Sequence, residues 1–241
     1  MKLLAWNIQQ GGAKRARAIA EVIQRFDADI LVLSELRHSS SELLLRLRDL
    51  GWRHQLTGLE LDRVAAVGIL SRHVLVPLAE TSVARVFPGR WIEAWVPSLG
   101  LVVAGVYGPL QTDPYDDFWH AVREVVPSRC EGAYLLAGDL NTGQSMLDAP
   151  KRRFFCSDHF VALGDLGLVD LWRSRYPERR EYSYHHRKGN GVDGNGFRID
   201  HILGSKTLAL RPYSCEYDLA VRSSRVSDHA PVAIEFIASA L

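Results

Sequence analysis

Cysteine is scarce in this sequence, and the few cysteines lie far apart. They are Cys130, Cys156 and Cys215. An odd number of cysteines without close pairs excludes a disulfide framework and a zinc knuckle. We therefore expect all three thiols to be reduced and mostly buried.

An excess of either charge is also missing. Lysine and arginine total 29 against 28 aspartates and glutamates, which leaves a formal net charge of +1. This balance argues against a protein that coats nucleic acid through bulk positive charge, although local basic stretches can still bind phosphates. Charge therefore neither requires nor excludes a nucleic-acid partner.

Long apolar runs, internal repeats and linkers are absent as well. No run approaches the roughly 20 apolar residues of a membrane span, and residues 1–8 become polar too soon for a signal peptide. With 47% hydrophobic and 24% charged residues, the chain can form a substantial core. We expect one domain over residues 1–241, in the cytoplasm, with no membrane span and no obligate protein partner.

What the sequence does contain is an alternation of apolar strands and amphipathic helices. The first elements expected are a strand, a helix and a strand, at 3–8, 13–26 and 29–34. Glu35 follows the second strand. Ser39 and Glu42 then predict a capping box for a helix that stops at Gly51.

The middle of the chain changes character, because β-rich stretches are separated there by turn signals. Asp113 and Pro114 predict the start of a further helix. The remaining strands are expected at 65–70, 91–96, 101–107, 133–137, 197–203 and 231–236. Helices mixed with partly antiparallel strands indicate α/β layers rather than a purely parallel doubly wound sheet.

Polar side chains stand at the ends of several of these apolar strands. A carboxylate at such a position is costly unless it is solvated, hydrogen-bonded or bound to a cation. Several of them converging would therefore suit a hard cation such as Mg²⁺. The residues are Asn7, Glu35, Tyr107, Asp139, Asn141, Asp200, Asp228 and His229.

Each group also has a purely structural interpretation. Asn7 precedes glycines and can simply turn the chain. Glu35 can be a surface acid beyond its strand, and Tyr107 can be a core aromatic with its hydroxyl at the rim.

The later groups have structural alternatives too. Asp139 and Asn141 flank an apolar residue and can form an Asx-turn. Asp200 lies two residues after Arg198, and the two can form a local ion pair. The triplet at 227–229 joins an acid to histidine, a combination that also occurs in turns.

Six short motifs in a fixed order distinguish the functional interpretation from these alternatives. They are Trp6-Asn7-Ile8-Gln9, Leu33-Ser34-Glu35, Val106-Tyr107-Gly108-Pro109, Gly138-Asp139-Leu140-Asn141, Arg198-Ile199-Asp200 and Ser227-Asp228-His229. The combination resembles the endonuclease/exonuclease/phosphatase superfamily, which includes exonuclease III-like and DNase I-like phosphoesterases. The resemblance implies an α/β fold of two packed mixed β-sheets flanked by helices, with the site where strand ends of both sheets meet.

The resemblance also implies a metal site. Glu35 would be the principal ligand of Mg²⁺, with Asn7 and Asp228 close enough to support it or a second ion. Oxygen ligands suit Mg²⁺ or Mn²⁺ better than zinc.

The same resemblance implies a set of catalytic residues. Asp139 would orient the attacking water, and Asn141 would hold Asp139 and a phosphate oxygen in register. Tyr107 would contact the phosphate. His229, oriented by Asp200, would stabilise the negative charge that develops on it.

Two positions depart from the pattern of abasic-site nucleases. Gln9 is neutral where some of them carry an acid, which argues against a second metal ligand there. His185 replaces a tryptophan that they often have, which puts abasic-site specificity in doubt. His185 and His186 lack a third ligand at metal spacing, so we expect structural or surface roles rather than zinc binding.

The substrate contacts implied are aromatic and basic. Tyr184, Phe197 and Ile199 could line a pocket for a flipped-out sugar, or be core residues of a hairpin, and Arg198 is a further candidate for substrate binding. The basic stretches at 151–153 and 187–188 could hold a phosphate backbone or be solvated loop charge.

Three functions follow in order of preference. The first is a Mg²⁺-dependent phosphodiesterase, a nuclease that hydrolyses DNA by direct attack of water. The second is the same chemistry on a small phosphorylated metabolite or a lipid head group, which the near-neutral charge favours. The third is a non-catalytic binding module, against which the complete set of site residues argues.

Overall fold

Alternation of side chains makes each central strand a two-faced element. In β1 (Lys2–Asn7), Leu3 and Ala5 belong to the core between the two sheets, whereas Leu4 and Trp6 pack with residues of the neighbouring helices. Apolar residues on both faces therefore require cover on both sides. The computed structural model describes residues 1–59, 65–149, 153–187 and 193–237.

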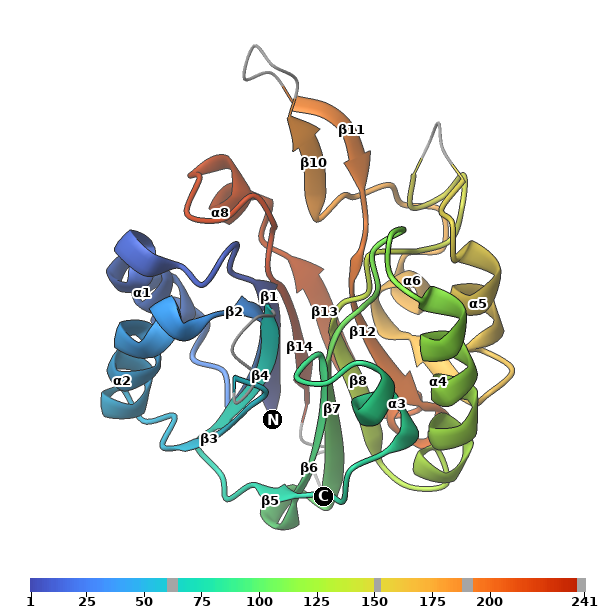
Figure 1. Ribbon diagram of the computed structural model, residues 1–241, viewed down its shortest axis with the longest axis horizontal. Helices are drawn as coiled ribbons and strands as arrows, with labels where there is room; N and C mark the ends of the chain where they lie inside the picture. The colour runs from blue at the N-terminus through green and yellow to red at the C-terminus, as the bar shows by residue number, and fades with distance from the viewer. Residues whose placement is uncertain (60–64, 150–152, 188–192, 238–241) are drawn as a thin grey trace.

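Two sheets pack face to face between layers of helices (Figure 1). This architecture confirms the predicted α/β fold of two packed mixed sheets flanked by helices. The first sheet contains, in spatial order, β13 (Tyr213–Tyr217), β14 (Val232–Phe236), β1, β2 (Ile30–Leu36), β4 (Ala66–Ser71) and β3 (His54–Thr57). Within it, β1 pairs parallel with β2 and antiparallel with β14.

The second sheet has a parallel pair at its centre. β7 runs parallel to β8, and β12 runs antiparallel to β8. The antiparallel pairing predicted for the middle of the chain is confirmed, since β6 pairs antiparallel with β7 and β4 with β2. The spatial order is β5 (Val76–Pro77), β6 (Trp91–Val96), β7 (Leu101–Tyr107), β8 (Tyr134–Asp139), β12 (Asp200–Ser205) and β9 (Leu168–Asp170).

Helices cover the outer faces of both sheets. On the first sheet lie α1 (Ala16–Phe26) and α2 (Ser41–Asp49), and on the second α3 (Ser82–Val86), α4 (Tyr115–Arg129) and α5 (Ser157–Ala162). Shorter helices are α6 (Leu171–Arg175), α7 (Lys206–Ala209) and α8 (Leu219–Ser223), with 3-10 turns at Ala13–Arg15, His38–Ser40 and Pro97–Leu99. The hairpin of β10 (Tyr184–Arg187) and β11 (Asp193–Phe197) projects from the body (Figure 1).

Two helix starts differ from the sequence prediction. The capping box of Ser39 and Glu42 does not form: Ser40 Oγ accepts a hydrogen bond from the Arg37 backbone at 3.0 Å, and α2 begins one residue later. Asp113 does not cap α4 either. Its carboxylate instead accepts hydrogen bonds from Arg90, at 2.8 Å, and from a backbone N–H of its own turn.

The strand predicted at 197–203 is divided in two. β11 ends at Phe197 and β12 begins at Asp200. Arg198 interrupts the strand because its backbone N–H donates to the Asp148 carbonyl at 2.9 Å, outside the sheet ladder. The hairpin and the second sheet can therefore point in different directions.

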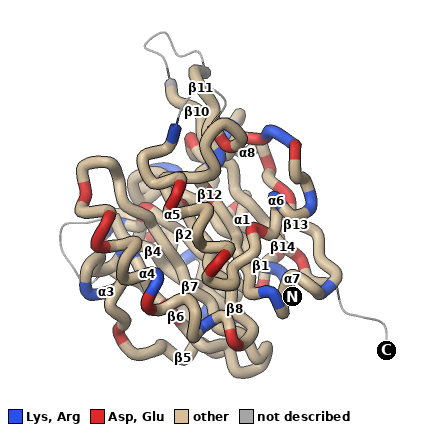
Figure 2. The backbone as a smooth tube through the Cα atoms, turned by 90° about the vertical axis from the view of Figure 1, so that its right-hand side faces the viewer, with Lys and Arg blue, Asp and Glu red and all other residues tan. Residues whose placement is uncertain are grey.

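The expectations for cysteine and charge agree with the structure. Cys156 and Cys215 are buried, Cys130 is partly buried, and all three are free thiols. Figure 2 shows basic and acidic residues interspersed over the face in view. None of the described helices is both long and apolar enough to cross a membrane.

Candidate active site

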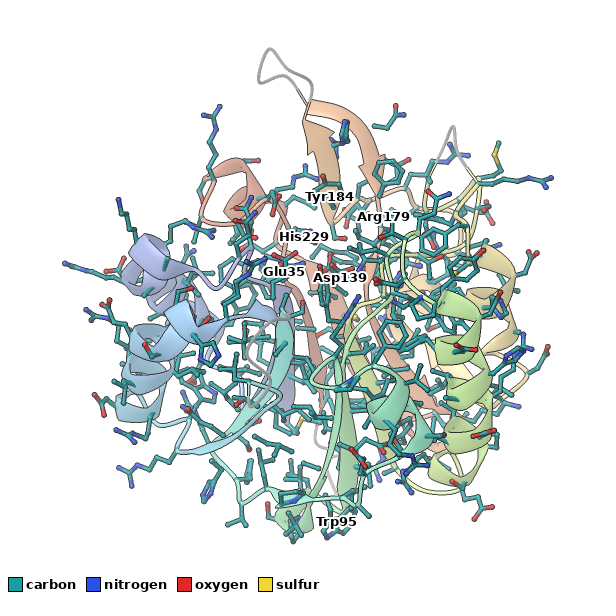
Figure 3. All side chains as sticks on the ribbon, viewed as in Figure 1. Glu35, Trp95, Asp139, Arg179, Tyr184 and His229 are labelled. Atoms are coloured by element: carbon teal, nitrogen blue, oxygen red, sulfur yellow. The ribbon has the colours of Figure 1, made fainter. Side chains whose placement is uncertain are left out.

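Strand pairing brings the polar strand ends together. The parallel pair β1 and β2 places Asn7 opposite the residue before Glu35. The parallel pair β7 and β8 places Tyr107 opposite Asp139, and β12 sets Asp200 against Asp139 from the other side. Because parallel strands end at the same edge, these groups share one end of the molecule. Figure 3 shows the Glu35 and Asp139 side chains gathered there, far from Trp95.

Asn7 links the two sheets at this end. Its side-chain amide is fully buried and donates to Glu35 Oε1 at 3.1 Å and to Asp139 Oδ2 at 2.9 Å. Its Oδ1 accepts from the Gln9 backbone at 2.9 Å, so the turn considered from the sequence is also present. One side chain therefore holds a carboxylate from each sheet.

Glu35 is held in a conformation that non-glycine residues rarely adopt. Its φ is +61°, a strained region that concentrates at functional sites. The carboxylate accepts from the Tyr107 hydroxyl at 3.3 Å and from the Gln10 backbone at 2.7 Å. Burial, followed by the charges of Asp139 and Glu35, raises the Tyr107 pKa, so this hydroxyl stays protonated as a donor.

Asp139 is a buried carboxylate with several donors. Its Oδ1 accepts from the Asn141 backbone at 2.8 Å, which is the Asx-turn considered from the sequence. The Asn141 side chain donates to the Gly108 carbonyl at 3.0 Å. Burial, and then the charge of Asp200, raises the Asp139 pKa to about 7, although His229 opposes the shift. The Asp139 carboxylate therefore both forms the Asx-turn and has a pKa near neutrality.

His229 and Asp200 form a buried pair. His229 Nδ1 donates to Asp200 Oδ2 at 2.7 Å. Burial alone would lower the His229 pKa, but the charge of Asp200 and this hydrogen bond outweigh it and raise that pKa to about 10. The imidazole is therefore positively charged at neutral pH.

Several of these residues are of the types that bind metal ions. Among the described residues, the cluster of metal-ligand types consists of Asp139, Asp200 and His229, whose ligand atoms lie within 4.8 Å of one another. Within this cluster His229 Nδ1 and Asp200 Oδ2 are hydrogen-bonded to each other at 2.7 Å, so the three residues do not fit as a ligand set. The oxygens of Glu35 and Asn7 do fit, because they are hard donors of the kind Mg²⁺ and Mn²⁺ prefer.

Asp228 lies beside the same group through Gln9. Gln9 Nε2 donates to Asp228 Oδ2 at 3.0 Å. An acid at position 9 would repel the Asp228 carboxylate, whereas the Gln9 amide binds it through this hydrogen bond. The three residues expected to bind metal are thus linked by hydrogen bonds that run through Gln9 and Asn7.

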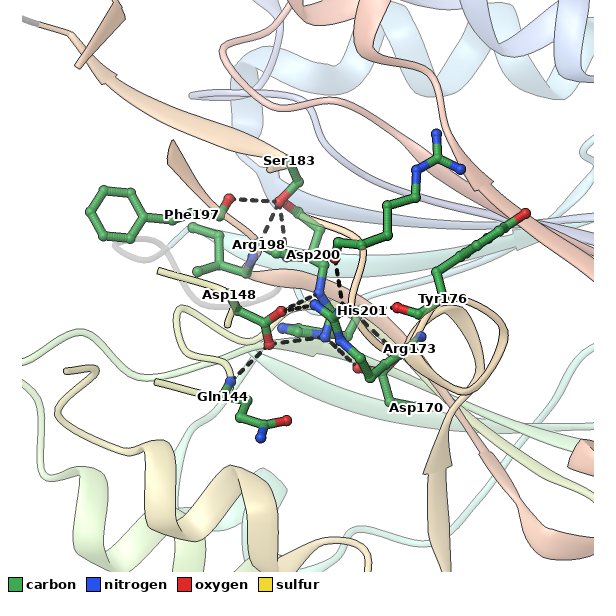
Figure 4. A network of polar contacts seen from close by, with 12 residues as sticks. Gln144, Asp148, Asp170, Arg173, Tyr176, Ser183, Phe197, Arg198, Asp200 and His201 are labelled. Carbon is green, nitrogen blue, oxygen red and sulfur yellow. Dashed lines mark hydrogen bonds and ion pairs between the residues drawn. The ribbon is translucent and has the colours of Figure 1, made fainter. Parts of the chain in front are cut away.

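Arg198 does not fit the substrate contact expected from the sequence. Its side chain is fully buried and forms a bidentate pair with Asp148, at 2.7 and 2.9 Å (Figure 4). A further contact of 2.6 Å joins it to Asp170. The local pair with Asp200 considered as an alternative is not what forms, because Asp200 binds His229. Arg198 is a structural residue that joins the loop after β8 to the start of β12.

The aromatic residues expected to contact substrate lie next to the His229–Asp200 pair. The Tyr184 ring is 4.9 Å from the His229 ring and 6.3 Å from that of Phe197. Phe197 also packs on Phe154 at 5.9 Å, whereas Ile199 is buried. Tyr184 and Phe197 are therefore partly exposed aromatic residues near His229, and Ile199 fits the core interpretation.

The histidine pair and the basic stretches complete the expected residues. Neither His185 nor His186 belongs to the cluster of metal-ligand types found among the described residues. His185 packs on Tyr182, with ring centroids 5.9 Å apart, and His186 is exposed. Residues 151–152 and 188 lie outside the described residues.

Sequence reasoning missed Arg90, which supports the end of β7. Arg90 Nε donates to the Tyr107 carbonyl at 3.0 Å, and Nη2 donates to that of Gly108. Its guanidinium also lies 4.6 Å from the centre of the Tyr107 ring. Nothing in the sequence signals this role, because Arg90 precedes the strand that pairs with β7 and belongs to none of the motifs.

The sequence matches the model of the Endonuclease/Exonuclease/phosphatase family over residues 4–229. The chain belongs to this family. Its motifs at the strand ends are therefore those of a family of phosphoric ester hydrolases.

Individual relatives agree with the family assignment. Exodeoxyribonuclease III of Haemophilus influenzae is 34% identical over 120 residues, which cover 42% of this chain and 45% of that protein. The match thus spans under half of the curated relative. Among solved structures, the 3′ phosphatase NExo from Neisseria, bound to a product DNA hairpin, superposes with a TM-score of 0.83 at 28% identity, covering 98% of this chain and 99% of that one.

A further solved structure shows the fold alone. An AP endonuclease from Archaeoglobus fulgidus has a TM-score of 0.80 at 20% identity, over 98% of this chain and 99% of that one. The fold of two packed sheets is therefore shared with proteins whose sequences differ more from that of this chain.

Proposed function

We propose that this member of the family is a metal-dependent phosphoesterase that hydrolyses phosphoric esters of DNA by direct attack of water. The observation that carries the proposal is the contact of Asn7 with both Glu35 and Asp139, next to the His229–Asp200 pair. Glu35 for the cation, Asp139 to orient the water and His229 as a positively charged hydrogen-bond donor thus lie side by side. These three groups can together position water and stabilise the charge that develops during hydrolysis of a phosphate ester.

Asp139 is the residue that orients the water and accepts its proton. A general base works best when its pKa lies near the working pH, and burial raises the Asp139 pKa to about 7. The Asn7 amide and the Asn141 backbone fix both carboxylate oxygens. The Asp139 carboxylate is therefore held in one orientation before substrate binds.

His229 and Tyr107 supply hydrogen-bond donors to the phosphate. The Asp200 contact at Nδ1 leaves the opposite ring nitrogen of the imidazolium as a donor. Donors fixed in a buried site stabilise developing negative charge more strongly than water does. We assign His229 to the charge that develops in the transition state, and Tyr107 to binding of the phosphate.

Glu35, Asn7 and Asp228 would hold Mg²⁺ or Mn²⁺, which neutralises charge on the phosphate when bound. Every donor in this set is an oxygen. The set therefore favours these ions over zinc.

DNA is the proposed substrate, and its 3′ end is the proposed position of attack. The Neisseria neighbours are described as a 3′ phosphatase and a 3′-5′ exonuclease, and both resemble this chain at 28% identity over nearly its full length. Tyr184 and Phe197 offer aromatic faces beside His229 on which a sugar or base can pack. His185, in place of the tryptophan that abasic-site nucleases often have, argues against an abasic site as the substrate.

A small phosphorylated ester is the second candidate. The net charge of +1 provides little bulk attraction for a DNA duplex. This candidate retains the same catalytic residues and changes only the groups that contact the rest of the substrate.

The proposal is tested by hydrolysis of a substrate panel by the purified protein, with Mg²⁺, with Mn²⁺ and with chelator. The panel comprises DNA with a 3′ phosphate, DNA with a 3′ hydroxyl, an abasic-site duplex, RNA, and small phosphomonoesters and diesters. We expect metal-dependent release of phosphate or nucleotides from DNA 3′ ends. Turnover of the small esters alone would select the second candidate, and turnover undiminished by chelator would overturn the metal site.

Two substitutions test the roles of the catalytic residues. We expect Asp139→Asn and His229→Ala each to lower kcat by about 10²–10⁴-fold, the usual contribution of acid–base and electrostatic groups, with circular dichroism unchanged. The exposed residues Asp165 and His120 provide the controls Asp165→Asn and His120→Ala. Near-normal turnover by either site variant would contradict the mechanism.

A further inference from the structure

A serine outside the six motifs is bonded to the backbone that carries Asp200. The Ser183 side chain is fully buried, and its Oγ accepts hydrogen bonds from the N–H groups of Ile199 and Asp200, each at 3.2 Å. Its hydroxyl donates to the Phe197 carbonyl at 3.4 Å (Figure 4). The hydroxyl therefore uses its one donor and both of its acceptor sites.

The backbone around Ser183 reaches the other member of the catalytic pair. The N–H of Ala230, the residue after His229, donates to the Ser183 carbonyl at 2.7 Å. The following residue, Tyr184, forms a β-bridge with His229, and its ring lies tilted against the His229 ring with the centroids 4.9 Å apart. One short segment thus touches the chain on both sides of the His229–Asp200 hydrogen bond.

The position of Asp200 in its strand explains why such a contact matters. Asp200 is the first residue of β12, and on one side it pairs with Asp139 of β8. On the other side, the register of β9 with β12 runs only from Leu203 to Ser205 among the described residues. Ser183 Oγ binds the two backbone N–H groups at the end that β9 does not reach. It takes the place of a neighbouring strand there.

We propose that Ser183 is a positioning residue that fixes Asp200 relative to His229, and so directs the imidazolium at the substrate phosphate. This inference rests on the proposed phosphoesterase function. Without the hydroxyl, two buried N–H groups lose their acceptor, and the start of β12 can shift toward other acceptors. A shift of about 1 Å is enough to misalign a catalytic donor.

Ser205 offers a matched control at the opposite end of the same strand. It is also fully buried, and its Oγ accepts from a backbone N–H, that of Tyr134, at 3.2 Å. Ser205→Ala and Ser183→Ala each remove one buried hydroxyl that binds backbone. Only Ser183 is bonded to the residues of the catalytic pair.

The experiment compares kcat, KM and melting temperature of the two alanine variants on the substrate that the wild-type protein hydrolyses fastest. We expect both melting temperatures to fall to a similar degree. Ser183→Ala should lower kcat at least fivefold more than Ser205→Ala, with little change in KM, because the loss lies in transition-state stabilisation. Ser183→Thr, which keeps the hydroxyl, should restore kcat.

Equal kcat values for the two alanine variants would overturn the inference, as would a threonine variant as slow as Ser183→Ala. A second readout does not depend on turnover. The Nδ1 proton of His229, hydrogen-bonded to Asp200, should give a downfield NMR resonance that moves in Ser183→Ala and stays in place in Ser205→Ala. An unmoved resonance would overturn the inference, whereas an inactive wild-type protein would overturn the proposed function alone.

Discussion

At the scale of single residues, the site depends on which of its buried acids is paired with a positive charge. Asp139 and Asp200 are both buried acids, and only one of them, Asp200, is paired directly with His229. Asp139 is left with uncharged donors, which is why burial can raise its pKa toward neutrality. The arrangement separates the proposed base, Asp139, from the acid that is hydrogen-bonded to the histidine.

Gln9 provides a test of the metal site at this scale. Its amide holds Asp228, so Gln9→Ala should leave this expected ligand less well oriented. We expect the Mg²⁺ concentration for half-maximal activity to rise about tenfold, as when an outer hydrogen bond to a metal ligand is lost. The measurement is an Mg²⁺ titration of turnover.

The neighbouring Gln10 supplies the control. Both residues have positive φ values, 54° and 51°, so alanine strains the backbone equally at either position. Gln10 reaches Glu35 through its backbone N–H, which Gln10→Ala retains. An Mg²⁺ requirement that shifts equally in both variants would argue against Asp228 as a ligand.

At the scale of elements, the site depends on how closely strand ends approach one another. Gly108 follows β7, and a Cβ built on it would lie 2.4 Å from the Leu140 carbonyl oxygen, which belongs to the loop after β8. Leu140 lies between Asp139 and Asn141. The spacing of the two strands therefore sets the position of both side chains, which we propose to be catalytic.

Gly108→Ala tests this dependence. The added methyl meets backbone, which cannot rotate away, so the β8 loop must move. We expect destabilisation of about 1–3 kcal/mol and a fall in kcat of about 10²-fold. Urea unfolding and steady-state kinetics provide the measurements.

Gly132→Ala is the matched control, because a Cβ there meets no atom within 4 Å. Its stability and kcat should stay close to those of the wild-type protein. Unchanged kcat in Gly108→Ala would show that the loop can move without cost to the site.

At the scale of the whole molecule, a buried ion network joins segments distant in sequence. Arg198 binds Asp148 and Asp170, and Arg173 binds Asp148 at 2.6 Å (Figure 4). Burial alone would raise the Asp148 pKa, but the Arg198 charge outweighs burial and lowers it. Burial alone would also raise the Asp170 pKa, but the Arg198 charge again outweighs burial and lowers it.

Acid should therefore weaken the fold through this network. The folded-state pKa of Asp148 lies below its unfolded value of about 3.9, so the folded state binds fewer protons. The network's stabilisation is then present above about pH 4 and is lost as the pH falls through the folded pKa. We expect Asp148→Asn to cost about 3–5 kcal/mol at pH 7, because it leaves a buried arginine short of a partner.

Urea unfolding at pH 7 and pH 3 tests this expectation. The stability gap between the wild-type protein and Asp148→Asn should narrow at pH 3. The exposed Asp165→Asn should differ little from wild type at either pH. A gap of equal size at both values would contradict the assignment of the charge pair.

Much of the fold and most of the site could be predicted from local signals. Apolar runs located the central strands, and the motifs named the residues that meet at their ends. The single domain, the cytoplasmic location and the individual catalytic roles stay predictions. Arg198 shows where motif reasoning failed, since a motif arginine in the sequence looks the same whether it faces substrate or is buried.

The sequence by itself determined the chemistry: which acids, amides and histidine stand at the strand ends, and the layered α/β architecture that buries the apolar faces between them. Only the tertiary structure decided which groups are partners. Asn7 touches Asp139 across 132 residues, and Ser183 holds the backbone of Asp200. Such pairings depend on strand order and register, which arise from packing of the whole chain and leave no local pattern in the sequence.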